Sequence, residues 1–189
     1  MTGVNRLSAS SADQSDEELL VDFRRGGEGG AALFERYREP VWKFFRRRLV
    51  DAGKAEELAQ DVFASLFEAS HRYEPRGRFR SYLFAIAYNV LMAERRKGRL
   101  ATPFDVDPDL TPIASADPGE ALWVQRALAD LDELDREVVM LREYEGLTYE
   151  EISLLHDVPV NTVRSRLFRA RMALRDALMP QPVQKEGAR

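Results

Sequence analysis

A chain of 189 residues with 44% hydrophobic and 32% charged side chains has room for one soluble domain or two small ones. No apolar run approaches the roughly 18 residues needed to cross a membrane, and no secretion signal is present, so we expect a cytoplasmic protein without membrane insertion. Cysteine is absent and only His71 and His156 remain as imidazole ligands, so neither a metal nor any other cofactor is expected, and the net charge of −4 argues against a simple basic DNA-binding domain.

The chain begins with a polar stretch, residues 1–15, whose composition predicts a disordered tail. A first helix is expected from Asp16, with acidic residues in its first turn. Residues 26–30 then contain four glycines, which are unfavourable inside a helix and predict a turn. This turn does not match a phosphate-binding loop, because no strand precedes it and no Gly-Lys-Ser/Thr follows it.

Two amphipathic helices are expected next, over residues 32–49 and 55–70. Pro40 should kink or interrupt the first of them. The basic run 46–48 near the end of that helix is interpreted as a solvated helix terminus. The second helix has a wide apolar stripe, and its polar face carries Glu57, Gln60 and Asp61. Taken alone, this second helix is an ordinary amphipathic helix.

Residues 71–79 form a loop rich in arginine, and a helix with several aromatic side chains is expected over residues 80–97. Aromatic rings that stack on bases and cations that meet the backbone together favour binding of single-stranded nucleic acid. For Phe84 and Tyr88 taken singly, packing in a helical core is an equally good interpretation. The candidate residues for this binding are Tyr73, Arg76, Arg78, Phe79, Tyr82 and Tyr88.

From residue 101 to 120 the chain has four prolines, five acidic residues and no basic one, and it has too little apolar content to form a core. We therefore expect a flexible acidic linker over residues 101–119. It separates two small helical domains, residues 16–100 and 120–179, and residues 180–189 form a C-terminal tail. The predicted fold class is all-α.

The second domain is predicted to end in a helix-turn-helix. Helices are expected over residues 121–130 and 136–143, and Thr148 and Glu151 then have the spacing of a capping box. Pro159 ends that third helix, and the fourth begins at residue 160. Its outward face offers amide, hydroxyl, guanidinium and aromatic groups that can read base edges, although a solvated basic face is the alternative. The candidate residues are Asn161, Thr162, Arg164, Ser165, Phe168, Arg169 and Arg171, with Arg166, Arg171 and Arg175 placed at the flanks to meet phosphates.

These segments resemble bacterial RNA polymerase sigma factors of the extracytoplasmic-function class. VPVNTVRSRLFRARMAL resembles the last helix of the family's domain four, and LDELDREVVMLREYEGLTYEEIS resembles the first half of that domain. AEELAQDVF and RSYLFAIAYN resemble its domain two, in the same order. The family usually has Gly, Glu and Trp where this chain has Asn161, Asp61 and Tyr82.

The resemblance implies a protein that binds core RNA polymerase at the largest-subunit clamp and at the flap, and that directs it to promoter DNA. Glu57, Gln60 and Asp61 would meet the clamp. The last helix would read the −35 element, and the arginine-rich loop would capture an extruded −10 base while Asn89 reads a neighbouring base. The linker would pass through the polymerase cleft, and a separate anti-sigma factor would regulate the chain. No catalytic residue is implied.

Two other classes of protein are alternatives to a sigma factor. A helix-turn-helix activator with a phosphorylated sensor domain would need alternating strands and helices, which the periodicity does not indicate. An enzyme would need a nucleophile–base pair, metal-ligand spacing or a phosphate loop, and the sequence offers none of these. The sigma-factor interpretation alone accounts for the linker, the arginine-rich loop and the helix-turn-helix together.

Overall fold

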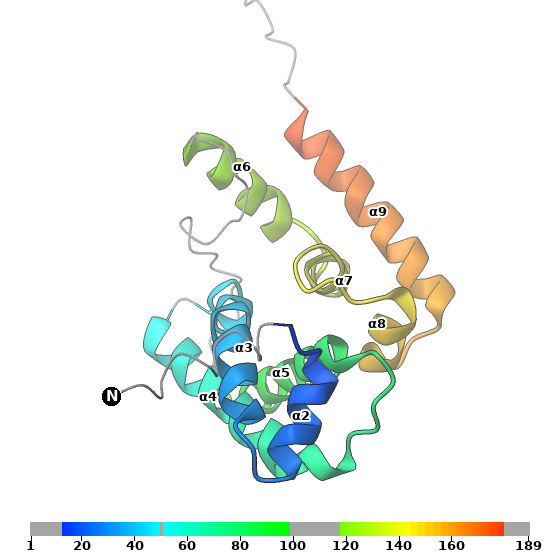
Figure 1. The fold of residues 1–189 in the computed structure, drawn as a ribbon. Helices are drawn as coiled ribbons and strands as arrows, with labels where there is room; N and C mark the ends of the chain where they lie inside the picture. The colour runs from blue at the N-terminus through cyan, green and yellow to red at the C-terminus, as the bar shows by residue number, and fades with distance from the viewer. Residues whose placement is uncertain (1–12, 50, 99–117, 180–189) are drawn as a thin grey trace, which may run out of the picture. The chain divides into compact units, whose positions relative to one another are not determined.

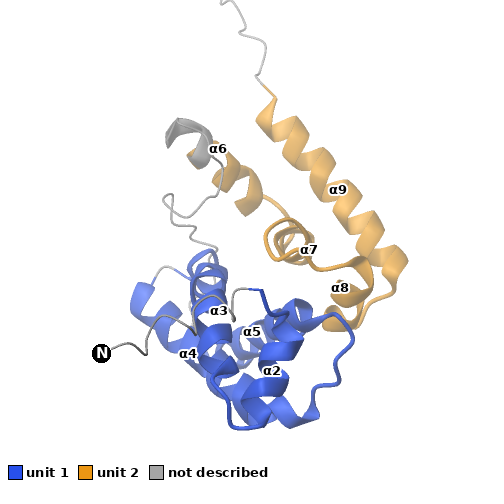
Figure 2. Ribbon diagram, viewed as in Figure 1, with its two compact units in different colours: residues 1–110 blue, residues 111–189 orange. Residues whose placement is uncertain are grey.

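The computed structural model describes residues 13–49, 51–98 and 118–179, and within these ranges every regular element is a helix (Figure 1). The predicted all-α fold is therefore confirmed. The chain divides into two compact units, residues 1–110 and 111–189 (Figure 2). In the described ranges, no helix is both long and apolar enough to span a membrane. Most of the predicted tails and linker lies outside the described residues.

The first unit packs its helices around a core of large apolar side chains. Its elements are α2 (Asp16–Arg24), α3 (Gly29–Arg46), α4 (Ala52–Ala69), the 3-10 helix η1 (Ser70–Arg72) and α5 (Phe79–Arg96). Helix α3 packs against α2 and α4, and α5 packs against α4. Phe44 is fully buried, and its ring lies 5.1 Å from that of Phe45 and 5.9 Å from that of Phe84.

The second unit contains the predicted helix-turn-helix. Its helices are α6 (Pro118–Ala129), α7 (Glu133–Glu143), α8 (Tyr149–His156) and α9 (Val160–Leu178). Pro118 and Gly119 were predicted to belong to the linker, but they lie at the start of α6. The capping box of Thr148 and Glu151 begins α8, and Asp157, with φ of 51°, ends it in the left-handed conformation. Helix α9 packs against α6, α7 and α8 through Val163, Leu167 and Ala170, which are almost fully buried.

Helices α2 and α3 approach each other so closely that only glycine fits at the start of α3. A Cβ atom at Gly29 would lie 2.0 Å from the carbonyl oxygen of Leu19, and one at Gly30 would lie 2.6 Å from the ring of Phe23. The Gly29 amide also donates a hydrogen bond to the Asp22 carboxylate at 2.8 Å. These glycines were predicted to lie in a turn. Instead they form the first turn of α3, because this is where the two helices touch.

Helices α3, α4 and α7 each begin three residues before the predicted start. The Asp51 side chain caps α4 by accepting the Lys54 amide at 3.1 Å, and the Asp132 side chain caps α7 by accepting the Leu134 amide at 3.1 Å. The first turn of a helix is fixed by such caps, whereas apolar periodicity begins only at the first buried residue. Pro40 does not interrupt α3, which continues past it.

The basic run at the end of α3 is buried, and its interpretation as a solvated terminus was wrong. Arg46, Arg47 and Arg48 are only 7%, 6% and 2% exposed. Arg46 donates to the Leu49 carbonyl at 2.9 Å, and Arg48 donates to the Phe44 carbonyl at the same distance. The Arg48 guanidinium also lies 3.9 Å from the centre of the Phe44 ring. Carbonyl oxygens and an aromatic face thus replace part of the water that burial removes.

We expect Gly29→Ala to destabilise the first unit. The added carbon cannot fit 2.0 Å from a backbone oxygen, so α2 and α3 must separate, at a cost of about 1–3 kcal/mol in unfolding free energy. Thermal unfolding of the purified protein measures this cost. Gly53→Ala is the control, because its added carbon meets only the Asp51 side chain, at 3.3 Å. Equal unfolding temperatures for Gly29→Ala and the unsubstituted protein would contradict the close approach.

Candidate nucleic-acid interface

Most of the predicted base-reading residues lie on the exposed side of α9. Asn161, Arg164, Ser165, Phe168, Arg169 and Arg171 are exposed, and Thr162 is half-buried. Phe168 is 64% exposed, which is unusual for a phenylalanine in a packed unit. The Ser165 hydroxyl donates to the Thr162 carbonyl at 2.9 Å, so its oxygen remains available as an acceptor. The helix therefore presents polar groups and one aromatic ring together.

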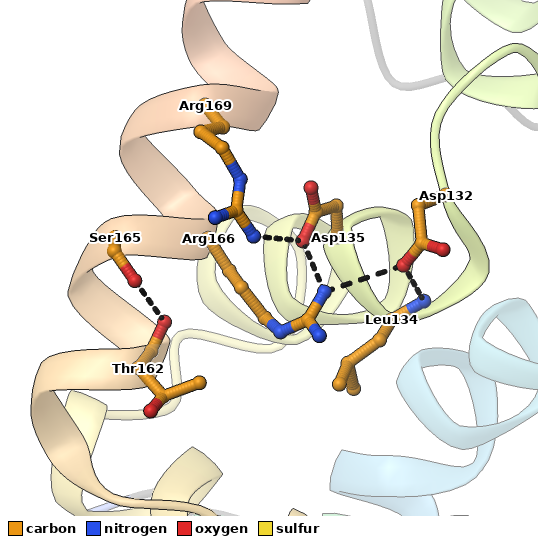
Figure 3. A network of polar contacts seen from close by, with 7 residues as sticks. All are labelled: Asp132, Leu134, Asp135, Thr162, Ser165, Arg166 and Arg169. Atoms are coloured by element: carbon orange, nitrogen blue, oxygen red, sulfur yellow. Dashed lines mark hydrogen bonds and ion pairs between the residues drawn. The ribbon is translucent and has the colours of Figure 1, made fainter.

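Arg166 has a different position from the one predicted for it. Its Nη1 atom lies 2.6 Å from Asp135 and 3.3 Å from Asp132 (Figure 3). The Arg166 side chain is only 24% exposed and the Asp135 side chain 12%. Arg166 therefore joins α9 to the start of α7 instead of standing ready for a phosphate. Arg169 reaches the same Asp135 oxygen only at 3.5 Å and stays 58% exposed.

The remaining arginines of α9 differ in how they are paired. Arg171 donates to Glu143 at 2.6 Å, and Arg175 donates to its neighbour Asp176 at 2.9 Å. Among the described residues, no acidic partner is found for Arg164. Its guanidinium is thus the α9 cation that is least engaged by the protein itself.

The arginine-rich loop of the first unit has its aromatic side chains turned inward. Phe79 is 2% exposed, and its ring lies 5.6 Å from that of Tyr37 and 6.1 Å from that of Tyr73. Tyr73 and Tyr88 are each 9% exposed. The predicted role of these three aromatic residues as exposed surfaces for bases is therefore corrected, because all of them are buried in this structure. Side chains that reach solvent are Arg76, Arg78 and Asn89, with Tyr82 half-buried.

Helix α2 holds this loop through contacts that the sequence analysis missed. One carboxylate oxygen of Glu17 accepts the Tyr73 hydroxyl at 2.7 Å and the amides of Arg76 and Gly77 at 2.9 and 2.6 Å. Burial, followed by the Glu17 contact, raises the pKa of Tyr73 to about 12. The Tyr73 hydrogen bond is the main cause of a lowered pKa at Glu17. Arg24 donates to the carbonyls of Ser70 and Tyr73. No local pattern signals contacts across such separations.

The polar face of α4 is exposed as predicted, at Glu57, Gln60 and Asp61. Glu57 pairs with Lys54 at 2.8 Å, and Lys54 also reaches the buried Glu94 at 2.9 Å. Gln60 lines a groove of about 680 Å³ between α3 and α4. The apolar part of its lining is Phe34, Pro40, Trp42, Ala59 and Phe63, and the charged part is Glu35, Arg36, Arg38, Glu39 and Glu56. Across the described ranges, no cluster of three acidic or histidine side chains is placed to hold a metal ion.

Comparison with known proteins finds relatives over most of the chain. A family model described as Sigma-70 region 2 matches residues 33–100, and one described as Sigma-70, region 4 matches residues 121–174. The chain is 32% identical to the RNA polymerase sigma-H factor of Pseudomonas aeruginosa, over 88% of this chain and 95% of that protein. It is 30% identical to the ECF RNA polymerase sigma-E factor of Escherichia coli K12, over 89% and 97% of the two chains.

Two solved structures share the fold at lower identity. CnrH in complex with the cytosolic domain of CnrY gives a TM-score of 0.65 at 23% identity, covering 87% of this chain and 97% of that chain. The sigma factor RpoE in complex with the anti-sigma factor NepR from Bartonella quintana gives 0.61 at 21%, covering 85% and 99%. The curated relatives and the two family models place the chain in the extracytoplasmic-function sigma factors, which bind core RNA polymerase and direct promoter-specific transcription.

Proposed function

We propose that α9 reads the −35 promoter element through its exposed face. The observation that carries this proposal is the division among its arginines: Arg166 is held by α7, whereas Arg164 faces solvent. A guanidinium can bind a guanine edge with two hydrogen bonds, and the exposed Phe168 ring can contact a thymine methyl. The proposed contacts are Asn161, Thr162, Arg164, Ser165, Phe168 and Arg169, with Arg171 at the flank.

The loop 73–78 and the start of α5 are proposed to bind the −10 element. Extruding a base costs a few kcal/mol, so the receiving surface must be formed before the DNA arrives. The residues proposed to contact DNA are Arg76, Arg78 and Asn89, which are exposed, and Tyr82, which is half-buried. The buried aromatic residues Tyr73, Phe79 and Tyr88 are proposed to support this surface from the core.

The polar face of α4 is the proposed site for the polymerase clamp. Gln60 lines the groove between α3 and α4, which offers apolar and charged groups to a partner, and Glu57 and Asp61 are exposed on the same helix. In this proposal residues 16–100 act as sigma domain two and residues 120–179 as domain four, which also meets the flap. The acidic segment before α6, residues 101–117, is proposed to join the two domains.

Regulation by a second protein is part of the proposal. CnrH was solved with the cytosolic domain of CnrY and RpoE with the anti-sigma factor NepR, and both share this fold. We infer that a separate anti-sigma factor binds this chain in the cytoplasm. The chain itself breaks and forms no covalent bond, since transcript synthesis belongs to the core polymerase.

Arg164→Ala should weaken holoenzyme binding to a −35 promoter and relax the base preference, because one good base contact contributes about 1–3 kcal/mol. Its unfolding temperature should not change. Arg166→Ala is the matched control, since it removes the 2.6 Å partner of the poorly exposed Asp135, leaves only the 3.5 Å contact with Arg169, and should lower the unfolding temperature. Binding assays on promoter variants and thermal unfolding measure both effects. The same loss of stability in both variants would contradict the division of roles.

Arg78→Ala should reduce promoter melting about tenfold, since it removes an exposed cation from the loop. Permanganate reactivity of the −10 region measures melting on a duplex promoter. A premelted template should restore most of the transcript, because the lost step is then bypassed. Failure of this rescue would show that the substitution acts on something other than melting.

Asp61→Arg should abolish holoenzyme formation, because reversing a charge at an interface costs about 2–5 kcal/mol. Helix content and unfolding temperature should be unchanged, since Asp61 is exposed. Glu28→Arg makes the same charge change in the same unit, at a helix start where the side chain forms no capping hydrogen bond. Co-purification with core polymerase and run-off transcription distinguish the two variants. Holoenzyme of native affinity with Asp61→Arg would refute the assignment of α4.

A further inference from the structure

Two backbone amides of the arginine-rich loop donate to a single carboxylate on helix α2. Glu17 lies in the first turn of α2, 59 and 60 residues before the two amides that it accepts, at Arg76 and Gly77. The same Oε1 atom accepts the Tyr73 hydroxyl at 2.7 Å. Gly77 has a φ of +68°, a conformation that favours glycine. The loop therefore closes around Glu17 in one defined shape.

A charged acceptor suits this arrangement better than a neutral one. Hydrogen bonds to a carboxylate are roughly twice as strong as those between neutral groups. One oxygen with three donors also needs the electron density of the ionised form, and these donors lower the pKa of Glu17. An amide in the same place would have the same shape but would hold the loop more weakly.

Helix α2 fixes the loop at a second point and is itself fixed by the core. Arg24, one residue from the C-cap of α2, donates to the carbonyls of Ser70 and Tyr73 where the loop begins. The close approach at Gly29 seats α2 against α3. The position of Glu17 is thus set by packing, and the loop takes its shape from that position.

We propose that Glu17 is a positioning residue for promoter melting, whose carboxylate sets the loop 73–78 in the shape that receives the extruded base. The proposal rests on the proposed function of this loop in the −10 element. A free loop loses conformational entropy when it is ordered, and this cost would add to that of base extrusion. Because Glu17 orders the loop when the protein folds, this entropy is already lost before DNA is bound.

Glu17→Gln tests the proposal because it keeps the size of the side chain and removes its charge. With full-length protein and core polymerase, open complexes on a duplex promoter should form about tenfold less efficiently, the change expected from losing a hydrogen bond to a charged group. Holoenzyme affinity and transcription from a premelted template should stay at the level of the unsubstituted protein. Glu18→Gln is the matched control. The Glu18 carboxylate accepts the amide and hydroxyl of the N-cap Ser15, a role that glutamine also fills, and these bonds lie at the start of α2, away from the loop.

Amide hydrogen exchange gives a second readout that does not depend on DNA. Glu17→Gln should speed exchange at Arg76 and Gly77 and leave the core of α3 and α4 unchanged, whereas Glu18→Gln should change neither. Tyr73→Phe removes one of the three donors and should cause a smaller loss of melting than Glu17→Gln.

Three results would overturn the proposal. The first is equal melting by Glu17→Gln and Glu18→Gln, and the second is a melting defect that the premelted template does not rescue. The third is loss of holoenzyme formation by Glu17→Gln, which would make Glu17 a general stabiliser of the unit. Arg78→Ala, measured in parallel, distinguishes failure of the role proposed for Glu17 from failure of the function proposed for the loop. If it melts DNA normally, the function proposed for the loop fails, whereas a defect in Arg78→Ala alone refutes only the role of Glu17.

Discussion

The first turn of α2 carries two carboxylates that reach distant parts of the same unit. Asp16 pairs with Arg36 at 2.6 Å and accepts the Tyr37 hydroxyl at 2.5 Å, which ties α2 to α3. Glu17 accepts the backbone of the loop 73–78. The two neighbours thus face different partners, one in the core and one in the loop. Much of the geometry of the proposed −10 surface depends on this one turn of helix, although the turn contributes no residue to that surface.

The second unit uses acids at a helix start in a comparable way. Asp132 caps α7 and also contacts Arg166, while Asp135 in the following turn binds Arg166 more closely (Figure 3). The acids hold α9 at a fixed rotation against α7, so that its other side chains face outward. Negative charge near the N-terminus of α7 is itself favourable, because it complements the helix dipole. Stability and positioning of α9 therefore come from the same residues.

The sequence predicted the helices, the turn of the helix-turn-helix and the polar face of α4, because these follow from local periodicity and caps. It missed features that depend on tertiary contacts. In the sequence, Arg46, Arg47 and Arg48 look like a solvated basic run, because only their neighbours along the chain are visible there. In the structure all three are buried. The burial of Phe79 could not be distinguished from exposure, since aromatic residues serve both cores and stacking surfaces. Glu17 gave no signal, because its partners lie far along the chain.

The internal pairing of α9 arginines has a consequence for how salt affects the protein. Its sequence contains five arginines, but Arg166 is held by two aspartates and Arg171 by Glu143. Each phosphate neutralised on DNA releases condensed counterions and steepens the fall of affinity with salt concentration. An arginine already neutralised by the protein releases fewer of them. Promoter binding by this chain should therefore depend less steeply on ionic strength than the number of its arginines suggests.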